Sequence, residues 1–171
     1  MNERRKFLRM ASAVGIPAAA AIVTGGVARA DDDNGTELLG SWSTIHTLPF
    51  PPGQFREFLS FAEGGVVHET NSFLHTASNL DFSMFGLPKV VNAADGVGSW
   101  VRTRNGGIQV VFRKLLFDGS HQNFGDLHVT GTLQIHASSQ LSADWHIQAV
   151  DLLDKVLVDL GPATSKGGRI G

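Results

Sequence analysis

Residues 126–137 read Asp-Leu-His-Val-Thr-Gly-Thr-Leu-Gln-Ile-His-Ala and alternate polar with apolar or small side chains. The polar row holds Asp126, His128, Thr130, Thr132, Gln134 and His136. A two-residue period is typical of a β-strand with one buried and one solvated face. We therefore expect a long strand here, with its apolar row toward the core. In the alternative interpretation, the polar row points inward.

The chain on both sides of this stretch repeats the β pattern in short runs rich in Val, Ile, Phe, Thr and Trp, separated by glycine turns. About eight strands are predicted, near residues 38–47, 55–62, 66–71, 99–104, 108–117, 126–137, 140–150 and 154–160. Residues 165–168 are expected as a loose tail or a turn into a final short strand. Antiparallel strands joined by tight turns form a meander, and closure of eight removes the exposed edges. The predicted fold is therefore all-β, a single antiparallel up-and-down barrel over residues 38–171.

Two segments allow a different fold. Residues 55–63 and 152–157 have some helical character, so an α+β cone like that of small ketosteroid-isomerase-like domains is the alternative. That fold needs long amphipathic helices early in the chain, and the sequence has no such pattern, so the barrel is favoured.

The segment 71–98 is too long for a hairpin and is rich in apolar residues. Long irregular segments in compact domains usually have a function or are disordered, and this one is too apolar for disorder. We expect it either to plug one end of the barrel or to cover its mouth as a lid, formed by residues 73–87.

Residues 1–30 resemble a twin-arginine export signal. Arg4 and Arg5 precede Lys6-Phe7-Leu8, residues 10–28 carry no charge, and Ala28-Arg29-Ala30 is a small-x-small cleavage site. A transmembrane anchor is the alternative, but this stretch is rich in Ala and Gly and lacks Leu and Phe. The resemblance implies cleavage after Ala30, with residues 31–37 left as a tether. It also implies that the twin-arginine translocase carries the folded domain to the periplasm or out of the cell.

Composition limits what the remaining domain can be. Cleavage leaves 141 residues with 9 basic and 15 acidic side chains, a net charge of −6. An acidic domain without basic clusters argues against nucleic acid and anionic membranes as partners. The chain has no cysteine, which excludes disulfides, thiolate metal sites and cysteine nucleophiles. The fold must therefore be stabilised by packing alone.

Two Gly-Ser-Trp tripeptides, at residues 40–42 and 98–100, lie at the starts of predicted strands. Gly-x-Trp at the first strand is the lipocalin signature, in which the Trp closes the bottom of the barrel. With residues 107–119 and 129–132, these motifs resemble small bacterial exported proteins of lipocalin-like or calycin type, over roughly residues 38–150. The related allene-oxide-cyclase barrels have the same implied fold. The chain has no tyrosine, so the second lipocalin signature, Thr-Asp-Tyr, is absent.

The resemblance implies a fold far more than an activity, and the first functional hypothesis is binding of a small apolar molecule. Ligand sites are mostly apolar concavities, and a small eight-stranded barrel is either filled by side chains or holds one small ligand. The aromatic residues are the candidates to form or line such a site: Trp42, Trp100, Phe112, Phe82, Phe85 and Trp145. A filled barrel with a purely structural role is a further alternative.

The enzymatic alternative is a cofactor-free isomerase, cyclase or lyase that uses the barrel interior. Asp126 and His128 lie on one face of a strand, about 6.5–7 Å apart, where a water or substrate can bridge them as an acid/base pair. Arg113 or Arg102 would stabilise charge. This reading requires the polar row to point inward.

The basic residues Arg102, Arg104, Arg113 and Lys114 fall on adjacent predicted strands. They either hold an anionic group at a barrel end or pair, exposed, across strands with Glu57, Glu69 or Asp126. The second reading is favoured.

No cofactor or metal is predicted. The sequence lacks a Gly-x-Ser-x-Gly elbow, a phosphate-binding loop and a dinucleotide fingerprint. None of the seven histidines forms a His-x₃-His pair. His128 and His136 would be about 26 Å apart along one strand, too far to share an ion.

Overall fold

The computed structural model describes residues 37–49, 52–72, 81–136 and 139–170. They form nine strands and almost no helix. The strands are β1 (Gly40–Pro49), β2 (Pro52–Ala62), β3 (Val66–Asn71), β4 (Asn92–Ala93), β5 (Gly96–Arg102), β6 (Ile108–Phe117), β7 (Asn123–His136), β8 (Gln140–Val150) and β9 (Val156–Arg169). The 3₁₀ turn η1 (Ser83–Phe85) lies between β3 and β4.

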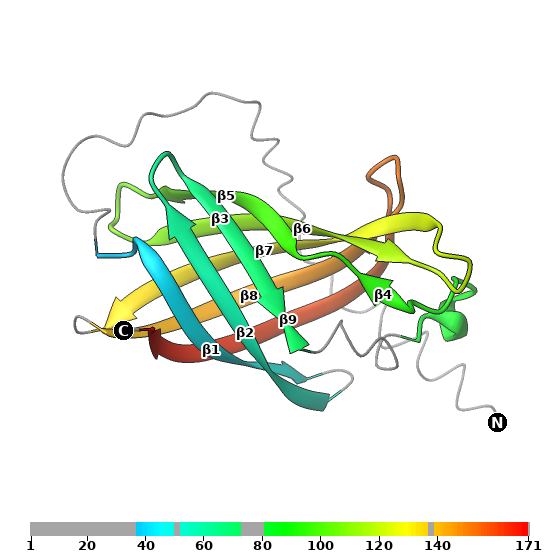
Figure 1. Cartoon of the computed structure of the whole chain (residues 1–171), viewed down its shortest axis with the longest axis horizontal. Helices are drawn as coiled ribbons and strands as arrows, with labels where there is room; N and C mark the ends of the chain where they lie inside the picture. The colour runs from blue at the N-terminus through cyan, green and yellow to red at the C-terminus, as the bar shows by residue number, and fades with distance from the viewer. Residues whose placement is uncertain (1–36, 50–51, 73–80, 137–138, 171) are drawn as a thin grey trace.

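Eight of these strands close into an antiparallel barrel, in the order β1-β2-β3-β5-β6-β7-β8-β9. The last strand pairs with the first, from Trp42 opposite Arg169 to Thr47 opposite Thr164. In Figure 1, β1, β2 and β3 cross in front of β7, β8 and β9, which form the far wall. The predicted all-β, up-and-down barrel is therefore confirmed, and the α+β cone is wrong.

The strands form where the sequence alternates. Along β6, buried residues take every second position, from Ile108 through Val110 and Phe112 to Leu116. On β7 the apolar row, including Leu127, Val129 and Leu133, is buried. The polar row of β7 therefore faces outward, and the alternative that points it into the barrel is wrong.

One end of the barrel is closed by Trp42, which is fully buried and donates from Nε1 to the carbonyl of Leu38, 2.8 Å away. Arg169 on β9 lies over the Trp42 ring. The expectation of a tail or short strand at residues 165–168 is wrong, because β9 runs unbroken from Val156 to Arg169 and completes the barrel.

The other end, away from the C-terminus, carries η1 and β4 (Figure 1). Phe82 and Val90 of this connection are buried in the core, and β4 pairs with β6. Residues 81–93 therefore pack on the barrel at this end, as expected of a plug. Residues 73–80 of the predicted lid lie outside the described residues. We refer to this end as the loop end.

Candidate functional site

Polar side chains lie inside the barrel on one wall, although most of the core is apolar. Thr44 and His46 come from β1, Glu57 from β2, Glu69 and Asn71 from β3, and Lys114 from β6, and all are at most 7% exposed. Their positions follow from register, because Thr44 is opposite Glu57 and Glu57 is opposite Asn71. We call these six residues the interior polar cluster.

Half of the cluster is built around Glu69. The Lys114 ammonium donates to Glu69 Oε2, and Asn71 Nδ2 donates to Glu69 Oε1 at 2.5 Å. Strand β5 lies between β3 and β6, and its inward position here is Gly96. A Cβ on Gly96 would lie 2.8 Å from Glu69 Oε2, so the missing side chain leaves room for this ion pair.

Burial raises the pKa of Glu69 to about 7. The Lys114 ammonium opposes this rise, and the nearby Glu57 carboxylate adds to it. The carboxyl group of Glu69 therefore titrates near neutral pH inside the barrel.

The other half of the cluster joins Glu57 to His46. Thr44 Oγ1 donates to Glu57 Oε2 at 3.1 Å, and His46 Nδ1 lies 3.5 Å from the same oxygen. The imidazole stacks on Phe55, with ring centroids 4.7 Å apart, and on Trp145 at 6.0 Å. These contacts hold the imidazole ring in one orientation.

His46 Nε2 is buried and has no hydrogen-bond partner among the described residues. A buried polar atom without a partner costs free energy, about 1–3 kcal/mol. A ligand group that donates a hydrogen bond to this nitrogen would remove that cost.

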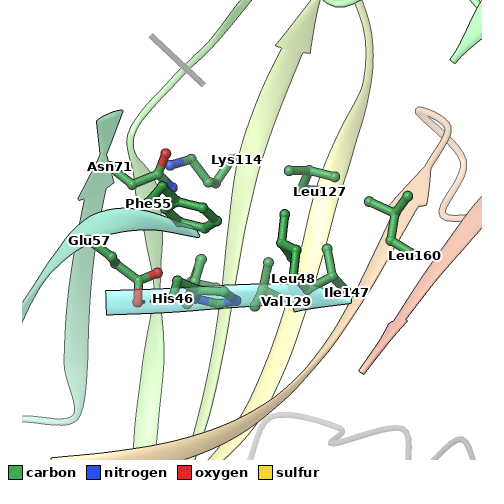
Figure 2. Close-up of a pocket in the computed structure, with 11 residues that line it drawn as sticks. His46, Leu48, Phe55, Glu57, Asn71, Lys114, Leu127, Val129, Ile147 and Leu160 are labelled. Carbon is green, nitrogen blue, oxygen red and sulfur yellow. Dashed lines mark hydrogen bonds and ion pairs between the residues drawn. The ribbon is translucent and has the colours of Figure 1, made fainter. Parts of the chain in front are cut away.

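A cavity of about 40 Å³ lies against the cluster near the loop end. Its lining combines His46, Glu57, Asn71 and Lys114 with the apolar residues Leu48, Phe55, Phe112, Leu127, Val129, Ile147 and Leu160. In Figure 2, Glu57, Asn71 and Lys114 lie on one side, and Leu127, Ile147 and Leu160 on the other. A bound molecule would contact hydrogen-bonding groups on one face and hydrocarbon on the other.

The cavity is small and lies close to the surface. At about 10–15 Å³ for each water-sized position, it holds roughly three waters. Phe55 and Leu160 line it and are only partly buried, so one layer of side chains separates it from solvent. A ligand larger than a few atoms requires these two side chains to move outward.

The predicted aromatic residues occupy different parts of the barrel. Phe112 lines the cavity. The Trp145 ring packs edge-on against the Phe112 ring, with ring centroids 5.7 Å apart, and Trp145 Nε1 donates a hydrogen bond to the Ser165 hydroxyl. Trp42 and Trp100 are buried, but they do not line this cavity. Phe82 is buried, whereas Phe85 is 41% exposed. Of the six candidates, only Phe112 lines the cavity.

The predicted acid/base residues lie on the outside of the barrel. Arg113 Nη2 contacts Asp126 Oδ2 at 3.0 Å and also pairs with Asp154. Partial burial, followed by the charge of Arg113, lowers the pKa of His128. Arg102 pairs with Glu37 at 2.7 Å, also outside the cavity lining. Arg113, Asp126 and Arg102 therefore form ion pairs outside the barrel, and none of the predicted acid/base residues belongs to the interior polar cluster.

Glu57, Glu69 and Lys114 were expected as exposed partners on the surface, and that expectation is wrong because all three are buried. The sequence did contain a signal for their burial, because Glu57 and Lys114 fall on the same alternating row of their strands as apolar core residues. Glu57 shares its row with Leu59 and Phe61, and Lys114 shares its row with Phe112 and Leu116. Charged residues are seldom buried unless paired, and here pairing within the barrel makes burial tolerable.

No group of three or more potential metal-ligating side chains comes together within the part of the chain that the structure describes. Among the described residues, no helix is long and apolar enough to cross a membrane. No protein-family model and no curated protein matches the sequence. The fold and the site define a closed eight-stranded antiparallel barrel with a mixed polar and apolar cavity near one end.

Proposed function

We propose that this protein binds one small, largely apolar molecule in the cavity at the loop end of a lipocalin-like barrel. The observation that carries the proposal is the division of the lining into an apolar wall and a polar wall with an unpartnered nitrogen. Binding pockets are mostly apolar with a few placed polar groups, and this lining has that composition.

The energetic cost of the interior polar cluster supports the same proposal. Replacing buried ion pairs by well-packed apolar side chains is often neutral or stabilising. A barrel that needed only a stable core would therefore gain little from Glu69 and Lys114. The cluster is better explained by a role in orienting a polar group of a bound molecule than by a role in stabilising the fold.

The direct test is native mass spectrometry, with organic extraction, of the protein purified from its own host. A bound small molecule is the expected result. In parallel, Val129→Phe fills the cavity from the inner face of β7, and Val111→Phe adds the same bulk on the outer face of β6. We expect Val129→Phe to lose binding of an apolar fluorescent dye and Val111→Phe to keep it. A barrel that is isolated empty and binds no apolar dye would contradict the proposal.

The second candidate function is a cofactor-free isomerase, cyclase or lyase, now centred on His46. The favouring observation is the contact of His46 Nδ1 with Glu57, because a carboxylate that orients an imidazole is a usual arrangement for a general base. The base would take a proton from one carbon of the substrate and return it to another. Deuterium exchange of acetone methyl protons in D₂O, followed by ¹H NMR, tests this step, and loss of exchange in His46→Phe is the expected result. No exchange above buffer with the native protein would eliminate this candidate.

Export through the twin-arginine translocase, with cleavage after Ala30, is part of the proposal. Strand β1 begins at Gly40, so all barrel strands follow the predicted cleavage site. A cysteine-free barrel that needs no disulfide chemistry is compatible with transport in the folded state.

A further inference from the structure

The two ring nitrogens of His46 have different surroundings. Nδ1 lies 3.5 Å from Glu57 Oε2, whereas Nε2 is buried without a partner among the described residues. The ring is 2% exposed, its Nδ1 contacts Glu57, and it stacks on Trp145 as well as on Phe55, so movement of Phe55 alone does not free it to exchange the two nitrogens. The protonation of Nδ1 therefore determines which kind of group Nε2 can bind.

The partners of Glu57 define the tautomer. An ionised carboxylate only accepts hydrogen bonds, and Glu57 Oε2 already accepts one from Thr44. The group that His46 presents to it must then be a donor, so the proton resides on Nδ1. A proton on Nε2 as well would leave a buried, charged donor with no acceptor among the described residues, which is costly, so the geometry assigns Nε2 as an acceptor. Nε2 therefore offers a lone pair within the cavity lining.

Both carboxyl groups of the cluster already accept hydrogen bonds from within it. Lys114 and Asn71 occupy both oxygens of Glu69, and Thr44 and His46 both contact Glu57 Oε2. The other side of the cavity is hydrocarbon, with no polar group to compete. A hydroxyl on a ligand has a clear acceptor in Nε2, and an ether or a hydrocarbon cannot donate to it.

We propose that His46 Nε2 accepts a hydrogen bond from the ligand and that the barrel therefore selects a small apolar alcohol or phenol. This inference rests on the proposed function, because it identifies the polar group of the molecule that the cavity binds. It makes His46 the residue that determines specificity and Glu57 the positioning residue that holds its tautomer.

Three matched probes test the proposal by isothermal titration calorimetry at pH 7. Phenol has a hydroxyl, anisole replaces the hydroxyl hydrogen with a methyl group, and toluene has no oxygen. We expect phenol to bind about tenfold more tightly than the other two, which corresponds to about 1.4 kcal/mol, in the range of one hydrogen bond. His46→Phe keeps a ring between Phe55 and Trp145, and it should remove this preference while toluene still binds. His68→Phe makes the same change on the exposed face of β3 and should leave the preference intact.

Equal binding of the three probes to the native protein, or a phenol preference that survives in His46→Phe, would overturn the inference but leave apolar binding intact. Failure of all three probes to bind would overturn the proposed function together with the inference. ¹⁵N NMR of histidine-labelled native protein is a test that does not depend on a variant folding. We expect a neutral His46 with protonated Nδ1 and unprotonated Nε2. The opposite tautomer, or a doubly protonated ring at pH 7, contradicts the proposal.

Discussion

Arg169 lies over the indole ring of Trp42, with its Cζ atom 4.8 Å from the ring centroid. The same guanidinium donates to the backbone carbonyl of Leu39 at 2.8 Å and to that of Glu37. One side chain at the end of the last strand therefore covers the residue that closes the barrel and also binds the chain that leads into the first strand.

Arg169→Ala should destabilise the barrel by about 1–3 kcal/mol. The change removes a cation–π contact, about 0.5–1 kcal/mol at an exposed site, together with hydrogen bonds from a charged donor. Arg169→Lys keeps the charge but not the planar fork, so its loss should be intermediate. Urea denaturation measures the effect, and Arg104→Ala in the exposed turn before β6 is the control, expected within about 0.5 kcal/mol of the native protein. Equal stability of Arg169→Ala and Arg104→Ala would show that the cover over Trp42 contributes nothing.

Gly131→Ala should destabilise the barrel by about 1–3 kcal/mol, the usual cost of overpacking, or more. A Cβ at Gly131 would lie 2.2 Å from Trp145 Cε3, so either the indole or strand β7 must shift. Gly119→Ala is the matched control, because a Cβ there meets nothing within 4 Å and its φ is not in the left-handed region. Thermal unfolding of both variants checks the prediction, which fails if the two melt at the same temperature.

The stability of the native protein should contain a component that falls as pH rises from about 4.5 to about 7. The carboxyl of Glu69 has an ordinary pKa of 4.5 and a pKa of about 7 in the folded barrel, where it faces Lys114, Asn71 and Glu57. Between these pH values the folded state holds a proton that the unfolded state has released, so folding becomes less favourable as pH rises. Above pH 7 this component is constant.

Glu69→Gln removes that titration, so the pH profile of its unfolding free energy should lack the falling component. The comparison of the two profiles isolates Glu69, with about 1.4 kcal/mol for each unit of pKa shift. Glu63→Gln, at an exposed turn position, should leave the native profile unchanged. Parallel profiles for the native protein and Glu69→Gln would exclude a raised pKa at Glu69.

Replacing Arg4 and Arg5 together by Lys should abolish export of the full-length chain, because the translocase is expected to recognise the signal through both arginines. Fractionation of the host cells measures the effect, and the exported native protein should begin at Asp31 by N-terminal sequencing. Arg9→Lys changes a basic residue outside the pair and should leave export intact. Export of the double variant at the native level would rule out the twin-arginine route.

The strand pattern was predictable because most strands alternate cleanly. The predicted ranges 66–71, 108–117 and 140–150 match β3, β6 and β8. Strand β9 was underestimated because Gly161, Pro162, Gly167 and Gly168 are turn residues by local preference. Pairing with both β8 and β1 overrides that preference, and no local signal contains this long-range contact.

The candidate site was less predictable than the fold. Parity could have placed Glu57 and Lys114 inside, but the preference of charged residues for the surface is the stronger prior. Lys114 and Glu69 lie on two strands separated by β5, and their contact depends on Gly96 of β5, which has no side chain between them. Asp126 and His128 were predicted as an acid/base pair because they lie on the strand with the clearest alternation. The same alternation places both side chains on the outer surface of the barrel.

The pairing of β9 with β1 has a consequence for biosynthesis. Until Ser165 and its neighbours leave the ribosome, a nascent chain presents two open sheet edges, one on β1 and one on the strand made last. Contacts between residues this distant in sequence also form slowly. The barrel can therefore close only after β9 has left the ribosome, and a chaperone that shields β1 until then would prevent association of unfinished chains.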